Sequence, residues 1–520
     1  MNQIGPALLH HSFTFATFLI LCLAASGRAA GPLAEAQVPV EEIRLANGFK
    51  LLLVEQPEST TVVAGWMVGV GSADDPSNRT GLSHLLEHMM FKGTRTVGAR
   101  DLVQELETLA EVDRIWHEEQ ALELKIESAS ARKRQKLTQQ LAGLVAERQS
   151  LQEKARSQAF LGLYSFLYSE QGGTDLNANT YRDLTAYYVT LPTEKLELWF
   201  WMESDRLTAP IFREFYKELG VIHEERRLRI DATPTGGLDE QLRGLFWGDH
   251  PYSWNPMGRP GDLDRIRREE AAGFFRRHYR ADNMTAVLVG GFDRELAKLW
   301  ARRYFGRLQS GSPAKSAAIR SGPPPRAQKR SFTDICNCPP QVQVLYPTAA
   351  FGHPDTYPLQ LLSAIMNGRT GRLYRSLVLD QQIAFSAYSQ QISWRQAGEF
   401  SFRAESKGVI DPEALIVAWD QQLDRLLSEA PTTAEIRRAK NRLAADAFRR
   451  LQEPAGLMKQ LLIYEGLGDW RYVNRWPSRI QELTAQDLVR AAAEYLKPAS
   501  RTIAIYRRPE TKTGTSPGAP

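Results

Sequence analysis

The sequence predicts an α+β protein made of two similar halves, and three observations lead to this fold class. The chain has 520 residues, more than a single hydrophobic core holds, since cores stop growing at about 250–300 residues. Residues 308–329 are rich in Ser, Ala and Pro and lack hydrophobic periodicity, which indicates an interdomain linker. The end of the segment before this linker also recurs, weakly, at the end of the segment after it.

The repeated unit is a helix followed by an apolar strand. Its matched positions are Ile266 with Ile480, Phe274 with Leu488, Tyr279 with Tyr495, and the strand 285–289 with the strand 502–505. Tyr279 and Tyr495 are 495 − 279 = 216 residues apart. Two copies of one α+β unit of roughly 200 residues therefore account for the chain. We expect a first domain over residues 38–307, a second over 330–507, and a polar, disordered tail over 508–520.

Residues 1–30 have the composition of a secretion signal. An apolar run over residues 13–25 is followed by small residues between Ser26 and Ala30, which are typical of a cleavage site. The stretch before the run carries no Lys or Arg, which departs from the usual signal peptide. Because the run is too short to span a bilayer comfortably, we expect a mature chain without a stable membrane span, exported to the periplasm or secreted.

The charge balance argues against a nucleic-acid partner. Lys and Arg number 65 against 60 Asp and Glu, which leaves a formal net charge of +5. No long basic run interleaved with aromatic residues occurs in the sequence. The charged side chains therefore predict an ordinary solvated surface rather than a nucleic-acid interface.

Inside the first domain, residues 41–70 favour strands that lead into a helix, and a segment over about 102–157 interrupts the domain. This segment has almost no Gly or Pro, many charged residues, and apolar residues at helical spacing on both sides of the polar patch 128–130. It predicts two long helices that pack like a short coiled coil in an antiparallel hairpin projecting from the domain. Contact with a partner and a purely solvated insertion explain this hairpin equally well.

The most informative pattern is the H-x-x-E-H run of His84, Glu87 and His88. On a helix, positions i and i+4 lie one turn apart on one face, so the two imidazoles can share one zinc ion. Glu87 then lies close enough to serve as general base toward a water molecule, in the inverted order of the inverzincins. Thr80 or Ser83 could cap the helix. The alternative is an exposed amphipathic helix with incidental histidines.

A catalytic zinc site needs a third protein ligand, and the segment 215–230 offers one on a predicted helix. Glu218 and Glu225 are seven residues apart, which is about two turns, so they share a face, while Glu224 points away. One member of the pair can bind the metal. The other can then orient a ligating histidine through its second ring nitrogen.

Three stretches carry a family resemblance. They are GLSHLLEHMMFKGT over residues 81–94, GGTDLNANTYRDLTAYYV over 172–189, and KELGVIHEERR over 217–227. The chain resembles the M16, or insulinase-type, metallopeptidases, a family that includes pitrilysin and the mitochondrial processing peptidase. Together with the repeat, the resemblance covers most of the mature chain. It implies two homologous domains, each an antiparallel-rich sheet packed with helices, that enclose a clam-like chamber; the second domain lacks zinc ligands.

The resemblance also implies residue roles. In the family, the Glu that follows an earlier Glu by seven residues binds zinc, which implies one Zn²⁺ per chain held by the two histidines and Glu225, with Glu218 as the supporting carboxylate. The separation of 225 − 88 = 137 residues is longer than usual in the family, and the hairpin accounts for the surplus. Asn177 and Ala178 are implied to lie on an edge strand that receives extended substrate. A plain turn and strand is the alternative.

The second half departs from the family pattern. Members often supply an Arg and a Tyr, seven residues apart, that bind substrate and polarise the scissile carbonyl. Here the corresponding positions hold Val378 and Phe385, and the loss of one such donor costs about 10²–10³ in rate. Arg375 or Tyr388 could substitute through a shifted register. Alternatively, a second M16-type subunit, or the other chain of a homodimer, could supply the missing pair.

These observations predict an exported, zinc-dependent endopeptidase that hydrolyses peptides or unfolded polypeptide segments, with Glu87 as general base. A second hypothesis is a non-catalytic or partner-dependent subunit of a two-chain peptidase. A third is a secreted peptide-binding protein without turnover. Cleavage of a peptide by the chain alone and together with a partner distinguishes the three.

Overall fold

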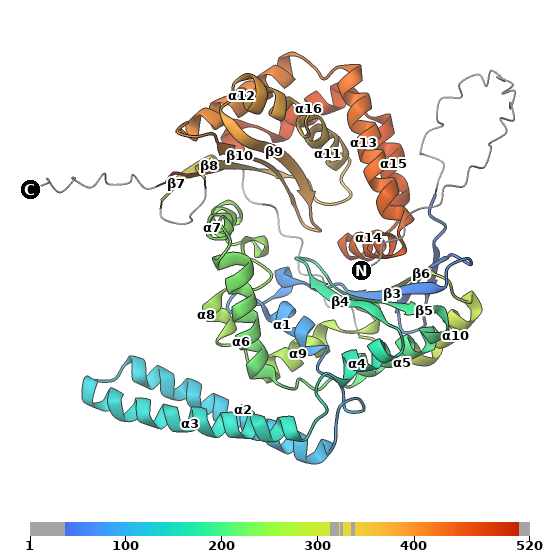
Figure 1. The fold of residues 1–520 in the computed structure, drawn as a ribbon, viewed down its shortest axis with the longest axis vertical. Coiled ribbons are helices and arrows are strands. Elements are labelled where there is room, and N and C mark those ends of the chain that lie inside the picture. The colour runs from blue at the N-terminus through green and yellow to red at the C-terminus, as the bar shows by residue number, and fades with distance from the viewer. Residues whose placement is uncertain (1–36, 312–321, 323–325, 334–338, 509–520) are drawn as a thin grey trace, which may run out of the picture.

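The computed structural model describes residues 37–311, 322, 326–333 and 339–508. The predicted signal peptide, most of the predicted linker and nearly all of the predicted tail lie outside these residues. The described chain forms two β-sheets with helices packed on both, and a long pair of helices projects from the first half (Figure 1). None of the helices in the described ranges is both long and apolar enough to cross a membrane.

The first half contains a six-stranded sheet in the order β1-β2-β6-β3-β5-β4. Its strands are β1 Glu41–Arg44, β2 Lys50–Glu55, β3 Thr61–Val68, β4 Thr174–Thr180, β5 Thr185–Pro192 and β6 Met284–Gly290. β2 and β6 pair in parallel and the other neighbours are antiparallel. β3 is buried along seven of its eight residues, as expected for a strand that is covered on both faces.

The second half contains a five-stranded sheet in the order β7-β11-β8-β10-β9. Its strands are β7 Gln328–Phe332, β8 Gln341–Thr348, β9 Ala384–Ser393, β10 Gly398–Ser406 and β11 Thr502–Tyr506. Taken in chain order, these strands repeat the pairing of β2, β3, β4, β5 and β6, including the single parallel pair. The prediction of two homologous α+β halves is therefore confirmed. β7 begins at Gln328, two residues inside the predicted linker.

Helices pack on the sheets in both halves. In the first half they are α1 Leu82–Met89, α4 Leu163–Glu170, α5 Leu196–Thr208, α6 Phe215–Arg226, α7 Gly236–Trp247, α8 Pro260–Leu263, α9 Arg268–His278 and α10 Arg294–Tyr304. In the second half they are α11 Thr356–Met366, α12 Glu413–Ser428, α13 Thr433–Gln452, α14 Pro454–Leu467, α15 Tyr472–Glu482 and α16 Ala485–Tyr495. The repeat found in the sequence corresponds to α9 with β6 and α16 with β11.

Each half contributes one helix that packs on the sheet of the other half. The apolar face of α14 packs on the first sheet through Leu457, Met458, Leu461 and Leu462, which contact side chains of β2, β3, β5 and β6. The apolar face of α7 packs on the second sheet through Leu238, Leu242, Phe246 and Trp247, which contact side chains of β7, β8 and β11. Each sheet is thus covered on one face by its own helices and on the other by a helix from the opposite half (Figure 1).

The predicted hairpin is present as α2 Leu102–Glu127 and α3 Ala131–Ser157, with its turn at the polar patch 128–130. Asp101 caps α2 by accepting a hydrogen bond from the backbone N–H of Gln104. Within α3 only Ala155, near the base, is buried. The free end of the hairpin therefore extends into solvent, away from both sheets (Figure 1).

Candidate metal centre

Helix α1 is held at its start by an acidic side chain from the preceding loop. The N-cap residue is Gly81, in the left-handed region at φ 94°, and it makes no side-chain cap. Asp75 instead accepts hydrogen bonds from the backbone N–H of Gly81 (2.8 Å) and of Ser83 (2.9 Å). The expectation that Thr80 or Ser83 caps the helix is therefore wrong: Thr80 donates to Asp262, and the Ser83 hydroxyl also donates to Asp75.

Helix α1 directs its apolar residues into the core and its two imidazoles to the opposite side. Leu82, Leu85, Leu86 and Met89 are fully buried in the first-half core. The rings of His84 and His88 lie 4.8 Å apart between centroids and nearly perpendicular to each other. The one-turn spacing of the motif therefore places both rings side by side, as the helical geometry requires.

Helix α6 brings a carboxylate to these two rings. Glu225 Oε2 lies 3.6 Å from His84 Nε2 and 3.4 Å from His88 Nε2. Two turns earlier on the same face, Glu218 Oε2 lies 3.2 Å from His88 Nδ1. Glu224 forms an exposed ion pair with Arg227 instead, although it lines the same cavity as the two imidazoles. The structure therefore brings together the same four side chains that the motif, the helical face and the resemblance single out.

The donor atoms of His84, His88 and Glu225 fit a zinc ion. Each residue offers one atom, and the three atoms lie within 4.8 Å of one another. Tetrahedral zinc with ligand bonds of about 2.0–2.2 Å separates neighbouring donors by about 3.4 Å, close to the nitrogen–oxygen distances seen here. Within the described ranges, no other group of three such side chains meets this spacing, and α11, the counterpart of α1, is apolar at the equivalent positions.

Glu87 faces the same space from the next position on α1. Its carboxylate is buried and accepts a hydrogen bond of 2.6 Å from the hydroxyl of Thr180, at the end of β4. Burial raises the pKa of Glu87, and the hydrogen bond from Thr180 opposes that rise only in part. A carboxylate with a raised pKa accepts a proton more readily near neutral pH, which suits a general base.

The electrostatics of the two histidines differ. Burial lowers the pKa of His84, and the neighbouring charge of His88 lowers it further. Burial acts in the same direction on His88, but hydrogen bonds to Glu218 and Glu225 outweigh it and raise the pKa of His88 to about 9. The hydrogen bond from His88 in turn lowers the pKa of Glu225. At neutral pH the metal-free site therefore keeps a proton on His88.

This proton predicts the pH dependence of metal binding. A zinc ligand must be a neutral imidazole, so the proton on His88 competes with the metal at every pH below about 9. We expect zinc affinity to rise about tenfold per pH unit between pH 7 and 9, with about one proton released per zinc bound. Titration calorimetry in buffers of different ionisation enthalpy measures this release. Zinc binding at pH 7.5 without proton release would contradict the assignment of His88.

A cavity of about 960 Å³ opens beside these residues. It is lined by His84, Glu87, His88 and Glu225, by residues 177–180 of β4, and by residues 255–257. All the described residues that line it belong to the first half. Asn177 is exposed and Ala178 is buried, and β4 forms the edge of its sheet. One row of backbone groups of β4 therefore has no neighbouring strand in the described sheet, and this edge borders the cavity.

The second-half residues that were considered as substrate-binding donors lie outside the cavity of the metal site. Val378 is half-buried in the helical turn Tyr374–Asp380 and packs on the second-half core. Phe385 and Tyr388 are exposed on β9, and Arg375 is exposed before it. None of these four side chains lines the cavity that holds the metal-site residues. Among the described residues, the second half therefore adds no hydrogen-bond donor to the lining of this cavity.

The sequence did not predict several contacts of the site. Lys92, just beyond α1, donates to Glu218, and Arg229 lies 2.9 Å from Glu225. Thr180 and Lys92 lie inside two of the stretches that carry the family resemblance, which is the one signal that pointed to them. No sequence pattern singles out Asp75, because the hydrogen bonds that it accepts depend on how its loop folds back over α1.

Known proteins are similar to this chain in sequence. A family model described as insulinase (peptidase family M16) matches residues 50–143, and one described as the peptidase M16 inactive domain matches residues 265–443. The zinc protease PqqE of Helicobacter pylori is 22% identical over 483 residues, which cover 90% of this chain and 92% of that protein. The mitochondrial-processing peptidase subunit beta of Lentinula edodes is 22% identical over 78% of this chain and 77% of its own.

Solved structures share the fold. The crystal structure of a protease from Helicobacter pylori has a TM-score of 0.73 at 21% identity and covers 90% of this chain and 99% of that chain. At this identity the likeness concerns the fold alone. It extends over both halves, so the arrangement of two related domains is common to the two proteins.

Proposed function

The chain belongs to the M16 family of metallopeptidases, and we propose on that basis that it is a zinc-dependent endopeptidase. Its substrates are peptides or unfolded polypeptide segments. The observation that carries the proposal is the convergence of His84, His88 and Glu225, from two helices far apart in sequence, at distances that suit one zinc ion per chain. Relatives named zinc proteases support the choice of metal.

In this proposal each residue of the site has one task. The imidazoles and Glu225 hold the metal, which when bound polarises a carbonyl and lowers the pKa of water. Glu218 accepts a hydrogen bond from His88 Nδ1 and so fixes the tautomer that leaves Nε2 free as a ligand. Glu87, held by Thr180, takes the proton from the attacking water and returns it to the leaving amine.

The substrate would bind as an extended chain along β4. An edge strand offers unpaired backbone N–H and C=O groups that a peptide can pair with, whereas side chains give selectivity. Asn177 and Ala178 lie on this strand at the rim of the cavity. A folded domain cannot present such a strand without unfolding locally, which is why short or unfolded segments are the expected substrates.

A second candidate is a subunit that needs a partner for full activity. It is favoured by one specific observation: Val378 and Phe385 occupy the positions where the family often has Arg and Tyr, and neither Arg375 nor Tyr388 lines the cavity. One relative is named as a subunit of the mitochondrial processing peptidase. In this candidate a second M16-type subunit, or a second copy of this chain, supplies the missing donors.

We also propose export, to the periplasm or the exterior. The apolar run over residues 13–25 and the small residues that follow it support this location. Peptides in such a compartment are suitable substrates for an enzyme that accepts extended chains. Neither the near balance of charge nor the site suggests a nucleic-acid partner.

Hydrolysis of an internally quenched peptide by the purified full chain tests the proposal. We expect turnover that a chelator abolishes and that added zinc restores, because the residues of the site act only with the metal in place. Addition of a second M16 subunit from the same source separates the candidates: a large increase favours the partner-dependent subunit. Zinc binding without cleavage in either mixture would contradict both and favour a peptide-binding protein.

A further inference from the structure

The base of the hairpin rests on the first turn of α6, the helix that carries Glu218 and Glu225. From α2, Glu105 forms a buried ion pair with Arg213, the residue two before α6 (3.0 Å between Oε2 and Nη2). Also from α2, Asp113 accepts a hydrogen bond of 2.8 Å from the hydroxyl of Tyr216 on α6. The ring of Tyr216 stacks on Trp116, with centroids 4.4 Å apart. These contacts join the start of α6 to residues 105–116 of α2.

The second hairpin helix joins the metal site through a row of alternating charges. Arg156 of α3 lies 2.9 Å from Glu214, the N-cap residue of α6. Glu214 lies 3.7 Å from Lys92, Lys92 donates to Glu218, and Glu218 accepts from His88. The row therefore runs without a break from the hairpin to an imidazole of the site.

Glu214 itself is held in a strained conformation. Its backbone lies in the left-handed region at φ 55° and ψ 25°, which residues other than Gly seldom adopt unless their surroundings enforce it. Three cations surround its mostly buried carboxylate, from Arg156, Lys217 and Lys92. The ion pair with Arg156 is thus one of the contacts that keep the start of α6 in this conformation.

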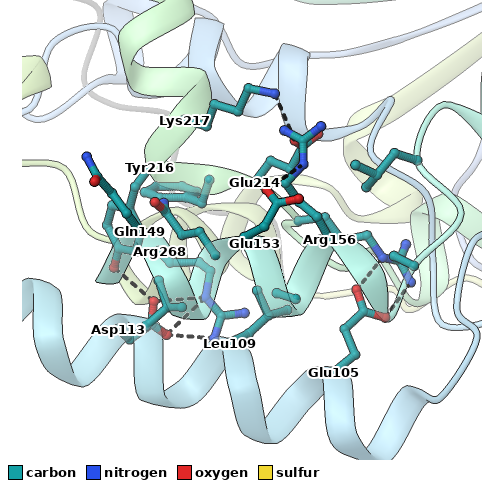
Figure 2. Close-up of a pocket in the computed structure, with 17 residues that line it drawn as sticks. Glu105, Leu109, Asp113, Gln149, Glu153, Arg156, Glu214, Tyr216, Lys217 and Arg268 are labelled. Carbon is teal, nitrogen blue, oxygen red and sulfur yellow. Dashed lines mark hydrogen bonds and ion pairs between the residues drawn. The ribbon is translucent and has the colours of Figure 1, made fainter. Parts of the chain in front are cut away.

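Apolar packing between the hairpin and α6 is incomplete. A cavity of about 180 Å³ separates them, with Leu109 and Val112 of α2 and Phe215 of α6 on its walls (Figure 2). Figure 2 shows the polar pairs at its margins, with Arg156 beside Glu214 at one end and Asp113 between Tyr216 and Arg268 at the other. Because side chains do not fill this space, the position of α6 against the hairpin depends largely on the polar pairs.

From these contacts we propose that the hairpin is a positioning device for α6. It holds the first turn of the helix, through Arg156 and Glu214 above all, and thereby sets Glu218 and Glu225 against the imidazoles of α1. The inference rests on the proposed metal site but concerns a residue, Arg156, that touches neither metal nor substrate. A weakened contact at the hairpin base should therefore be detected as weaker zinc binding.

The test compares single variants of the full chain and one double variant. Arg156→Met removes the ion pair but keeps an unbranched side chain, and Arg156→Lys keeps the charge. Arg114→Met is the matched control, since Arg114 is half exposed and, among the residues that the structure describes, forms ion pairs only with Glu111 and Glu118 of its own helix. The measurements are the zinc dissociation constant, by competition with a coloured chelator, and hydrogen exchange of the α6 amides in the metal-free chain.

We expect Arg156→Met to weaken zinc binding about three- to tenfold, below the roughly 10–100-fold that loss of a direct supporting group causes. Exchange should accelerate in α6 and not throughout the chain. Arg156→Lys should restore most of the affinity, and Arg114→Met should match the wild type. Glu214→Gln should weaken binding as well, and the double variant should lose less than the sum of both effects.

Unchanged zinc affinity and unchanged α6 exchange in Arg156→Met would overturn the inference, as would accelerated exchange over the whole chain. If the wild type binds no zinc, the proposed function fails. Faster exchange confined to α6 would then still support the hairpin as a positioning device, and its absence would overturn that too.

Discussion

Glu87→Gln is expected to lower kcat/KM for peptide hydrolysis by about 10²–10⁴-fold, the range for loss of a general base. The amide cannot take a proton from water, but it has nearly the same shape and its oxygen can still accept the hydrogen bond from Thr180. Glu87 is not one of the three grouped donors, so zinc content should stay at one per chain. The loss should therefore appear in kcat rather than in metal binding.

Thr180→Val is a useful companion variant, because it removes only the hydrogen bond to Glu87. Its effect on kcat should be smaller than that of Glu87→Gln, since the carboxylate remains. Rates are measured with one quenched peptide at a fixed pH, after the zinc content of each preparation has been determined. Equal rates for Glu87→Gln and the wild type would rule out the proposed role of this carboxylate.

Glu225→Ala is expected to have the largest effect on metal binding. It removes one of three protein ligands, so zinc affinity should fall by more than the roughly 10–100-fold typical of a supporting carboxylate. Glu224→Ala is the matched control: the residue is the adjacent glutamate on α6, and it is exposed in a pair with Arg227. Glu218→Gln should lie between the two, because it weakens the contact with His88 without removing a ligand.

Zinc dissociation constants of the three variants, measured side by side by chelator competition, test this ranking of zinc affinities. Circular dichroism and thermal unfolding of the metal-free chains show whether the fold is retained. Equal affinities for Glu225→Ala and Glu224→Ala would contradict the placement of the third ligand. An effect of Glu218→Gln larger than that of Glu225→Ala would indicate that Glu218 is the zinc ligand and Glu225 the supporting carboxylate.

Local periodicity predicted the features that depend on a single element. The one-turn spacing of His84 and His88 and the two-turn spacing of Glu218 and Glu225 each define one helical face. The hairpin followed from a long segment without Gly or Pro and a polar break, and α2 and α3 begin and end within about two residues of the expectation. The two halves were visible because a helix and a strand recur together.

Contacts between distant elements were not predicted, because no local pattern encodes them. Thr180 reaches Glu87 across 93 positions of the chain, and Lys92 reaches Glu218 across 126. The packing of α7 and α14 on the sheet of the opposite half depends on which strand residues face outward. Those residues cannot be identified before the strand order of each sheet is known. The contact of the hairpin base with α6 is of the same kind, since the sequence predicted the hairpin but not the helix against which its base packs.

Elemental analysis of the full-length wild-type chain, purified without chelators, tests the metal centre most directly. The geometry of His84, His88 and Glu225 predicts one zinc per chain that survives dialysis at pH 8 and is lost with Glu225→Ala. A chain that retains no transition metal under these conditions, even after incubation with zinc, would contradict it.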